Sequence, residues 1–256
     1  MIGDIKTVAH GTFDRYFRMK ELYVILGLCI FLISVLGRYD ELTLNMGREF
    51  MIDGALAVLA IVSVITSMSV IFEKSREIRE KTAHFIIAKP SGRTSYIWGK
   101  FLGVAALSIF NIAIITIGAF FMFKMSSLDM NVDSFSTNFT YAAVLITVES
   151  FVLIAVGLFL SMFFSDTIAT LLLFVVFVLG HSLYLLPRME KFADMSWLNT
   201  VCNLFPNLFN LDMKREVTAN IAVSGDYMWM GISYGLLYAL AFVFLSVVIF
   251  NRKDIA

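Results

Sequence analysis

Residues 73–100 read EKSREIREKTAHFIIAKPSGRTSYIWGK, the largest charged block in the chain. Charges of opposite sign alternate from Glu73 to Lys81, which is typical of a solvent-exposed helix with i,i+4 pairs worth about 0.2–0.5 kcal/mol each. Pro90 and the glycine at position 92 should end that helix, and Ser91 or Thr94 could cap the next one. The block therefore predicts a surface helix over 73–89, a tight turn and re-entry into an apolar helix. The alternative is a plain solvated connector.

The composition outside this block is that of a membrane protein. Of 256 residues, 59% are hydrophobic, and the mean hydropathy is +0.82. A soluble domain of this size could not bury that much apolar surface, whereas 25 Phe and 14 Met residues suit lipid-facing and adaptable packing positions. A net charge of zero gives no long-range attraction to nucleic acid, so we expect no nucleic-acid partner. The methionines are scattered and the two cysteines are far apart, so neither predicts a metal site or a disulfide.

Apolar runs that approach the roughly 20 residues needed to cross a bilayer recur along the chain. They occupy residues 22–37, 51–72, 101–123, 139–164, 167–187 and 230–250. This pattern predicts an all-α membrane protein with six transmembrane helices in one permease domain, 1–256. Its parts are spans 1–2 (22–72), a charged loop (73–100), spans 3–5 (101–187) with only Ser165-Asp166 between the fourth and fifth, and span 6 with its tail (230–256).

Two further segments predict helices at the membrane surface. Residues 1–21 place Ile5, Val8 and Phe13 on one side of a helix, which indicates an amphipathic interfacial helix; the alternative is a frayed tail. Residues 188–229 are too apolar for a free loop, so we expect short helices resting on the outer membrane surface.

The distribution of positive charge predicts the orientation. Segments 1–21, 73–100 and 251–256 hold 13 of the 20 Lys and Arg residues. Because positive residues favour the cytoplasmic side, both termini and the 73–100 block are expected there, in an integral protein of the inner membrane.

No motif for bond-breaking chemistry is present in the sequence. Gly99-Lys100 is followed by Phe101 rather than Ser or Thr and lacks the preceding glycine of a phosphate-binding loop, so we expect no ATP hydrolysis, no catalytic residue and no cofactor in this chain. Three polar residues at membrane depth are candidates for a translocation path: Asn111, Glu149 and His181. The alternative is that each is a hydrogen-bonded packing residue within the bundle.

The charged block also carries a family resemblance. A charged helix, a Thr, an apolar pair, Lys-Pro, a turn with Arg, and Gly-Lys opening a span resemble the first cytoplasmic loop of the type-2 ABC exporter permeases. The matching residues are Glu77, Glu80, Thr82, Ile86-Ile87, Lys89-Pro90, Arg93 and Gly99-Lys100. The terminal Asn251-Arg252-Lys253-Asp254 resembles the end of such permeases.

The resemblance implies a non-catalytic permease subunit of an ATP-driven exporter. Six spans would form one half, which pairs with a second half as a homodimer or heterodimer, and two copies of a separate ATPase subunit would carry ATP and Mg. The helix over 73–89 would be the coupling helix, and the residues implied to couple to the ATPase are Glu73, Arg76, Glu77, Glu80, Thr82, Lys89, Pro90 and Arg93. Besides the lipid bilayer, an accessory protein on the outer face is a further expected partner.

Other functions stay open at this point. A secondary transporter could use Glu149 as its ion or proton site and would need no ATPase, but the sequence shows no inverted repeat. A membrane enzyme or a scaffold for other membrane proteins are further alternatives.

Overall fold

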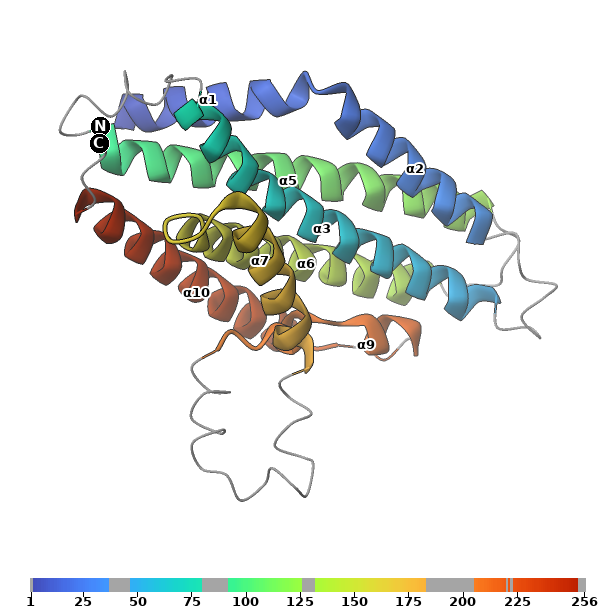
Figure 1. Cartoon of the computed structure of the whole chain (residues 1–256). Helices are drawn as coiled ribbons and strands as arrows, with labels where there is room; N and C mark the ends of the chain where they lie inside the picture. Colours follow the sequence, from blue (N-terminus) through green and yellow to red (C-terminus); the bar gives the residue numbers. More distant parts are fainter. Residues whose placement is uncertain are drawn as a thin grey trace.

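The computed structural model describes residues 2–36, 47–79, 92–125, 132–182, 205–219, 221 and 223–252. Every regular element in these ranges is a helix, which confirms the all-α prediction. In chain order they are α1 (Ile2–Phe17), α2 (Lys20–Leu36), α3 (Gly47–Arg79), α5 (Gly92–Met125), α6 (Val132–Leu160), α7 (Asp166–Ser182), the 3-10 helix η3 (Leu208–Leu211), α9 (Lys214–Thr218) and α10 (Gly225–Arg252). The long helices form a bundle, and the start of α1, the start of α5 and the end of α10 lie at one end of it (Figure 1).

Four helices of the described ranges are long and apolar enough to cross a membrane. They contain Glu49–Phe72, Gly92–Lys124, Ser136–Leu160 and Gly225–Arg252, while the apolar helices Tyr23–Val35 and Asp166–Ser182 are shorter. All six predicted spans therefore coincide with apolar helices. The count of six bilayer-crossing helices stays a prediction.

Two predicted boundaries differ from the structure. Helix α6 ends at Leu160 rather than 164, because Phe163 N donates to Leu160 O at 3.0 Å, an i→i−3 bond that turns the chain out of the α-helix. The connection to α7 is therefore longer than Ser165-Asp166. Thr94 is the third residue of α5, so it does not cap that helix, and Ser91 lies outside the described residues.

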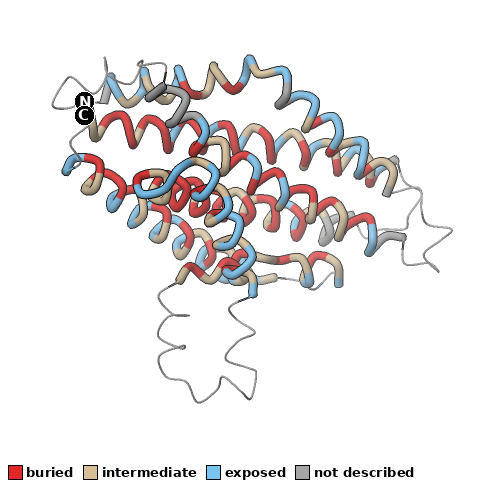
Figure 2. Tube along the Cα trace, viewed as in Figure 1, coloured by how far each residue is buried: buried red, intermediate tan, exposed pale blue. Residues whose placement is uncertain are grey.

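Helix α6 is the centre of the bundle and packs against α3, α5, α7 and α10. In Figure 2 buried positions follow α3, α5 and α6, whereas α2, α7 and α10 carry long exposed stretches. Helix α10 reaches α6 through two glycines spaced by four: a Cβ at Gly231 would lie 2.9 Å from Leu145 Cδ2, and one at Gly235 would overlap Val148. Small residues at this spacing let two helix backbones approach closely.

Helix α1 packs lengthwise along the first half of α5. A Cβ at Gly99 would lie 2.6 Å from Val8 Cβ, and one at Gly103 would lie 2.8 Å from Ala9 O. Further along, the rings of Phe17 and Phe110 are 5.4 Å apart, so the two helices run in the same direction. The predicted helix in 1–21 is thus confirmed, while its position at a membrane interface stays a prediction.

Short helices also form in the described part of the predicted outer loop. The 3-10 helix η3 packs under α7, where a Cβ at Gly180 would lie 2.7 Å from Leu208 Cγ. Helix α9 is fixed to the start of α3, because Thr218 Oγ1 donates to Asp53 Oδ1 at 2.6 Å. Both helices lie at the end of the bundle away from the start of α1 (Figure 1). The outer-face location remains a prediction.

Candidate functional site

The first part of the charged block, residues 73–79, continues a predicted span as one helix. Helix α3 has 33 residues, from Gly47 to Arg79. At 1.5 Å per residue it is about 50 Å long, against about 30 Å for the hydrocarbon layer, so it is long enough to project well beyond a membrane. Glu73, Arg76 and Glu77 occupy positions in the last two turns of α3. Four other predicted coupling residues lie outside the described residues: Glu80, Thr82, Lys89 and Pro90.

The remaining predicted coupling residue, Arg93, joins two helix ends. It is the second residue of α5, and its Nη1 donates to Asn251 O, near the end of α10, at 3.3 Å. Asn251 Nδ2 in turn donates to Thr94 Oγ1 at 3.4 Å. The structure therefore brings the two segments that carry the family resemblance, the start of α5 and the end of α10, into direct contact.

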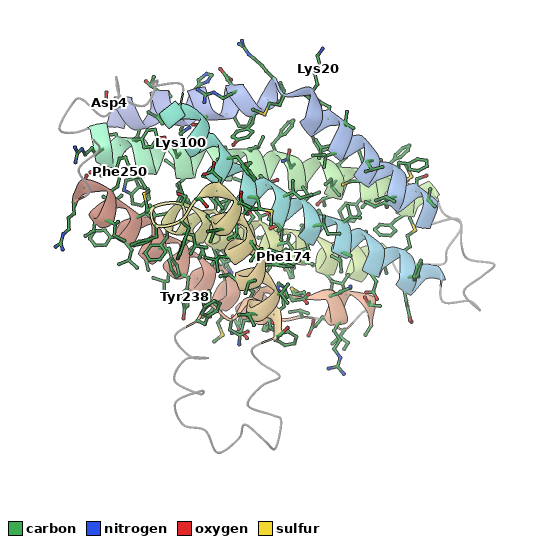
Figure 3. The ribbon with its side chains drawn as sticks, viewed as in Figure 1. Asp4, Lys20, Lys100, Phe174, Tyr238 and Phe250 are labelled. Carbon is green, nitrogen blue, oxygen red and sulfur yellow. The ribbon has the colours of Figure 1, made fainter. Side chains whose placement is uncertain are left out.

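A buried lysine lies about two turns further along α5. Lys100 is only 1% exposed, and its Nζ lies 5.7 Å from the centre of the Tyr96 ring, within the range of a cation–π interaction. The Tyr96 ring stacks on Phe250 at 5.8 Å, so α10 closes this site (Figure 3). The sequence pattern predicts Lys100 only as part of the Gly99-Lys100 pair that opens a span and carries the family resemblance. Its i,i+4 spacing from Tyr96 was the signal for this contact.

The buried Glu149 of α6 lies next to His181 of α7, whose side chain is 24% exposed. Glu149 is 1% exposed, and its Oε1 lies 3.8 Å from His181 Nε2. His181 Nδ1 lies 3.1 Å from Phe177 O; because a carbonyl only accepts, Nδ1 carries the proton of that bond and Nε2 faces the carboxyl group. Glu149 Oε1 has no hydrogen-bond partner among the described residues. At 3.8 Å the two groups do not form a hydrogen bond, but they are close enough for a charge on one to act on the other.

A layer of hydroxyl groups crosses the bundle beside this pair. Ser108 Oγ of α5 and Ser150 Oγ of α6 are 2.5 Å apart. Ser67 Oγ of α3 shares its single proton between Ser63 O, at 2.7 Å, and Ser150 O of α6, at 3.3 Å. These bonds join α3, α5 and α6 by groups that pair with one another away from water.

Asn111 belongs to a different part of the bundle. Its Nδ2 donates to Thr66 Oγ1 at 3.1 Å, which joins α5 to α3. In the part of the chain that the structure describes, no hydrogen bond or ion pair connects Asn111 to Glu149 or His181. The three predicted path residues therefore form two separate sites, one between α6 and α7 and one between α3 and α5.

Within the described ranges, no group of three or more His, Cys, Asp and Glu side chains could hold a metal ion.

A search of curated proteins found no match to the chain. A family described as "ABC-2 family transporter protein" matches residues 16–255, which include every helix from α2 to α10 and the charged block. Because this match covers nearly the whole sequence, the protein is an integral membrane protein that belongs to the ABC-2 transporter family.

Proposed function

We propose that this chain is one permease half of an ATP-driven exporter, coupled through residues 73–93 to a separate ATPase. The observation that carries the proposal is the continuity of α3: one unbroken helix runs from the apolar core of the bundle to the charged end at Arg79. Membership of the ABC-2 family supports a transport component that works with an ATPase. ATP and Mg would bind to that partner, present in two copies.

The mechanics follow from the length of this helix. Swinging a rod about 50 Å long by 10° moves its end by roughly 9 Å. Closure of the ATPase around ATP would push the 73–79 end, and the helix would transmit this push to its buried face, where Ser67 is bonded to Ser150 of α6. The change in tilt would then alter access between this half and a second permease half, identical or different.

A connection between α5 and α10 would lie at the same end of the bundle as residues 73–79. Arg93 and Asn251 connect the start of α5 to the end of α10. The first turn of α5, which follows the proposed coupling segment, is therefore held against the last span. Both chain ends and the coupling segment would face the cytoplasm from the inner membrane, and an accessory protein could bind the opposite face, where α9 lies.

Glu149 and His181 are retained in the proposal as candidates for the translocation path. They lie on α6 and α7, next to the moving α3, which packs on both helices. The comparisons give no support to a secondary transporter that uses Glu149 as its ion site, because the family match is to an ABC transporter component.

Affinity purification tests the proposal. The full chain, tagged and expressed with the genes that neighbour its own, should be recovered with an ATP-hydrolysing subunit. The double change Glu77→Lys and Glu80→Lys should remove that subunit, because it reverses two charges on the coupling segment. A matched control, Glu216→Lys with Asp226→Lys, makes the same change in charge at the other end of the bundle and should leave recovery unchanged. Equal recovery with both double variants would refute the assignment.

A further inference from the structure

A small pocket lies where α1 and α2 meet α3 and α5. Its volume is about 140 Å³, and its wall includes Ile25 of α2, Ile65 of α3 and Leu107 of α5. This is close to the volume of protein cavities that hold one benzene molecule. Ile65 is 41% exposed, so the pocket borders the apolar outer surface of the bundle, from which a molecule dissolved in the membrane could enter.

One polar group in the wall lacks a partner. Asn111 lines the pocket and is 4% exposed, and its Oδ1 has no hydrogen-bond partner within the described ranges. Its Nδ2 donates to Thr66 Oγ1 at 3.1 Å. Tyr16, another lining residue, already donates its hydroxyl to Ser69 O at 2.6 Å. A residue of the wall therefore carries a buried acceptor that is unsatisfied, and a donor on a ligand that reached it would satisfy it.

We propose that this pocket binds a neutral, phenol-sized apolar group that carries a hydroxyl, with the O–H donating to Asn111 Oδ1. The hydrocarbon body of the ligand would rest on Ile25, Ile65 and Leu107. A carboxylate or phosphate is excluded, because an anion would face a carbonyl oxygen, and a cation would lose its hydration without an opposite charge in the wall. The same hydroxyl chemistry is offered by a small alcohol and by a neutral membrane lipid.

This assignment goes beyond the proposed function and stands without it. The pocket is walled partly by α3, so an occupant would also stiffen the contact between that helix and the α1–α2 turn. Ligand binding to the chain alone needs no ATPase partner. A negative binding result would therefore be distinct from a failure of the permease assignment.

Binding can be measured by fluorine NMR on the full chain in nanodiscs of synthetic phosphatidylcholine. The probes are 4-fluorophenol and fluorobenzene, which differ only in the hydroxyl group, and protein-free nanodiscs correct for partition into lipid. In Asn111→Leu the preference for fluorophenol should fall about 2- to 12-fold, the range for one neutral hydrogen bond, while fluorobenzene binding persists.

A second pair of variants keeps the proposal falsifiable if Asn111→Leu fails to fold. Ile65→Trp places a large ring at the rim and should abolish binding of both probes, whereas Ile61→Trp, one turn away on the exposed face of α3 and not part of the wall, should not. A fluorophenol preference that Asn111→Leu leaves intact, or binding that survives Ile65→Trp, would overturn the assignment, as would a site that takes up water only.

The source of the natural hydroxyl can be separated in the same assay. Diacylglycerol added to the nanodiscs should displace fluorophenol if the occupant is a membrane lipid. Displacement by a small alcohol such as cyclohexanol but not by diacylglycerol would assign the pocket to a soluble molecule. Both results support the site.

Discussion

The close contact between α1 and α5 leads to a sharp prediction for Gly103→Ala. The new methyl group would lie 2.7 Å from Thr12 Cβ and 2.8 Å from Ala9 O. Carbon atoms in contact are normally about 3.5–4.0 Å apart, so the backbone of α1 would have to move by about 1 Å. Gly118→Ala on the same helix is the matched control, because its methyl group would meet only the Ile30 side chain, at 3.4 Å.

The magnitude follows from two opposing terms. Replacing glycine by alanine inside a helix favours folding by about 1 kcal/mol at both positions. Overpacking at Gly103 costs about 1–3 kcal/mol, and at Gly118 it costs little. The free energy of unfolding of Gly103→Ala should therefore be lower than that of Gly118→Ala by about 1–3 kcal/mol, a difference in which the propensity term cancels.

Hydrogen–deuterium exchange on the purified chain locates the effect. Amides of residues 2–17 should exchange faster in Gly103→Ala than in the parent chain, because α1 separates from α5, while exchange in Gly118→Ala should stay at the parent rate. Equal stability of the two variants, together with unchanged exchange in α1, would show that the two helices do not pack as the structure describes.

Three further predictions concern the polar contacts of the bundle. His181→Ala should lower the free energy of unfolding by about 1–3 kcal/mol, because it removes the imidazole that lies 3.8 Å from the buried Glu149 carboxyl group. Glu149→Gln in the same chain should restore most of the loss in a denaturant titration, and no restoration would contradict the pairing. Thr218→Val should cost about 1.5 kcal/mol and speed exchange in α9, whereas unchanged exchange there would rule out an anchoring role for the Asp53 bond. Ser108→Ala and Ser150→Ala should be non-additive by about 0.5–1 kcal/mol in a double-mutant cycle, and simple additivity would mean that the two hydroxyl groups do not interact.

The sequence predicts the elements of this fold better than their contacts. Apolar runs of about 20 residues locate α3, α5, α6 and α10, and the alternating charges after Phe72 correctly predict that α3 continues as a helix. The turn at the end of α6 is missed because Met162, Phe163 and Phe164 are as apolar as the helix before them. Hydropathy cannot distinguish a turn from a helix there, since only the backbone hydrogen bonds differ.

The partners of the candidate residues depend on which helices face one another. The sequence marks Glu149 as an ionisable residue within an apolar run, but its neighbour His181 is 32 positions away on another helix, and periodicity does not connect residues of two helices. A usable signal did exist for two helix contacts: Gly99 with Gly103, and Gly231 with Gly235, both have the Gly-x-x-x-Gly spacing of close helix packing.

The central claim is that the 73–93 segment meets a nucleotide-driven partner, and site-specific photo-cross-linking tests it most directly. A photoreactive residue at position 77, introduced into the full chain in its native membrane, should form an adduct with an ATP-binding protein. The same residue at position 216, on α9 at the opposite end of the bundle, should not. An adduct with the ATP-binding protein at position 216, or none at position 77 in a complex that still hydrolyses ATP, would contradict the account.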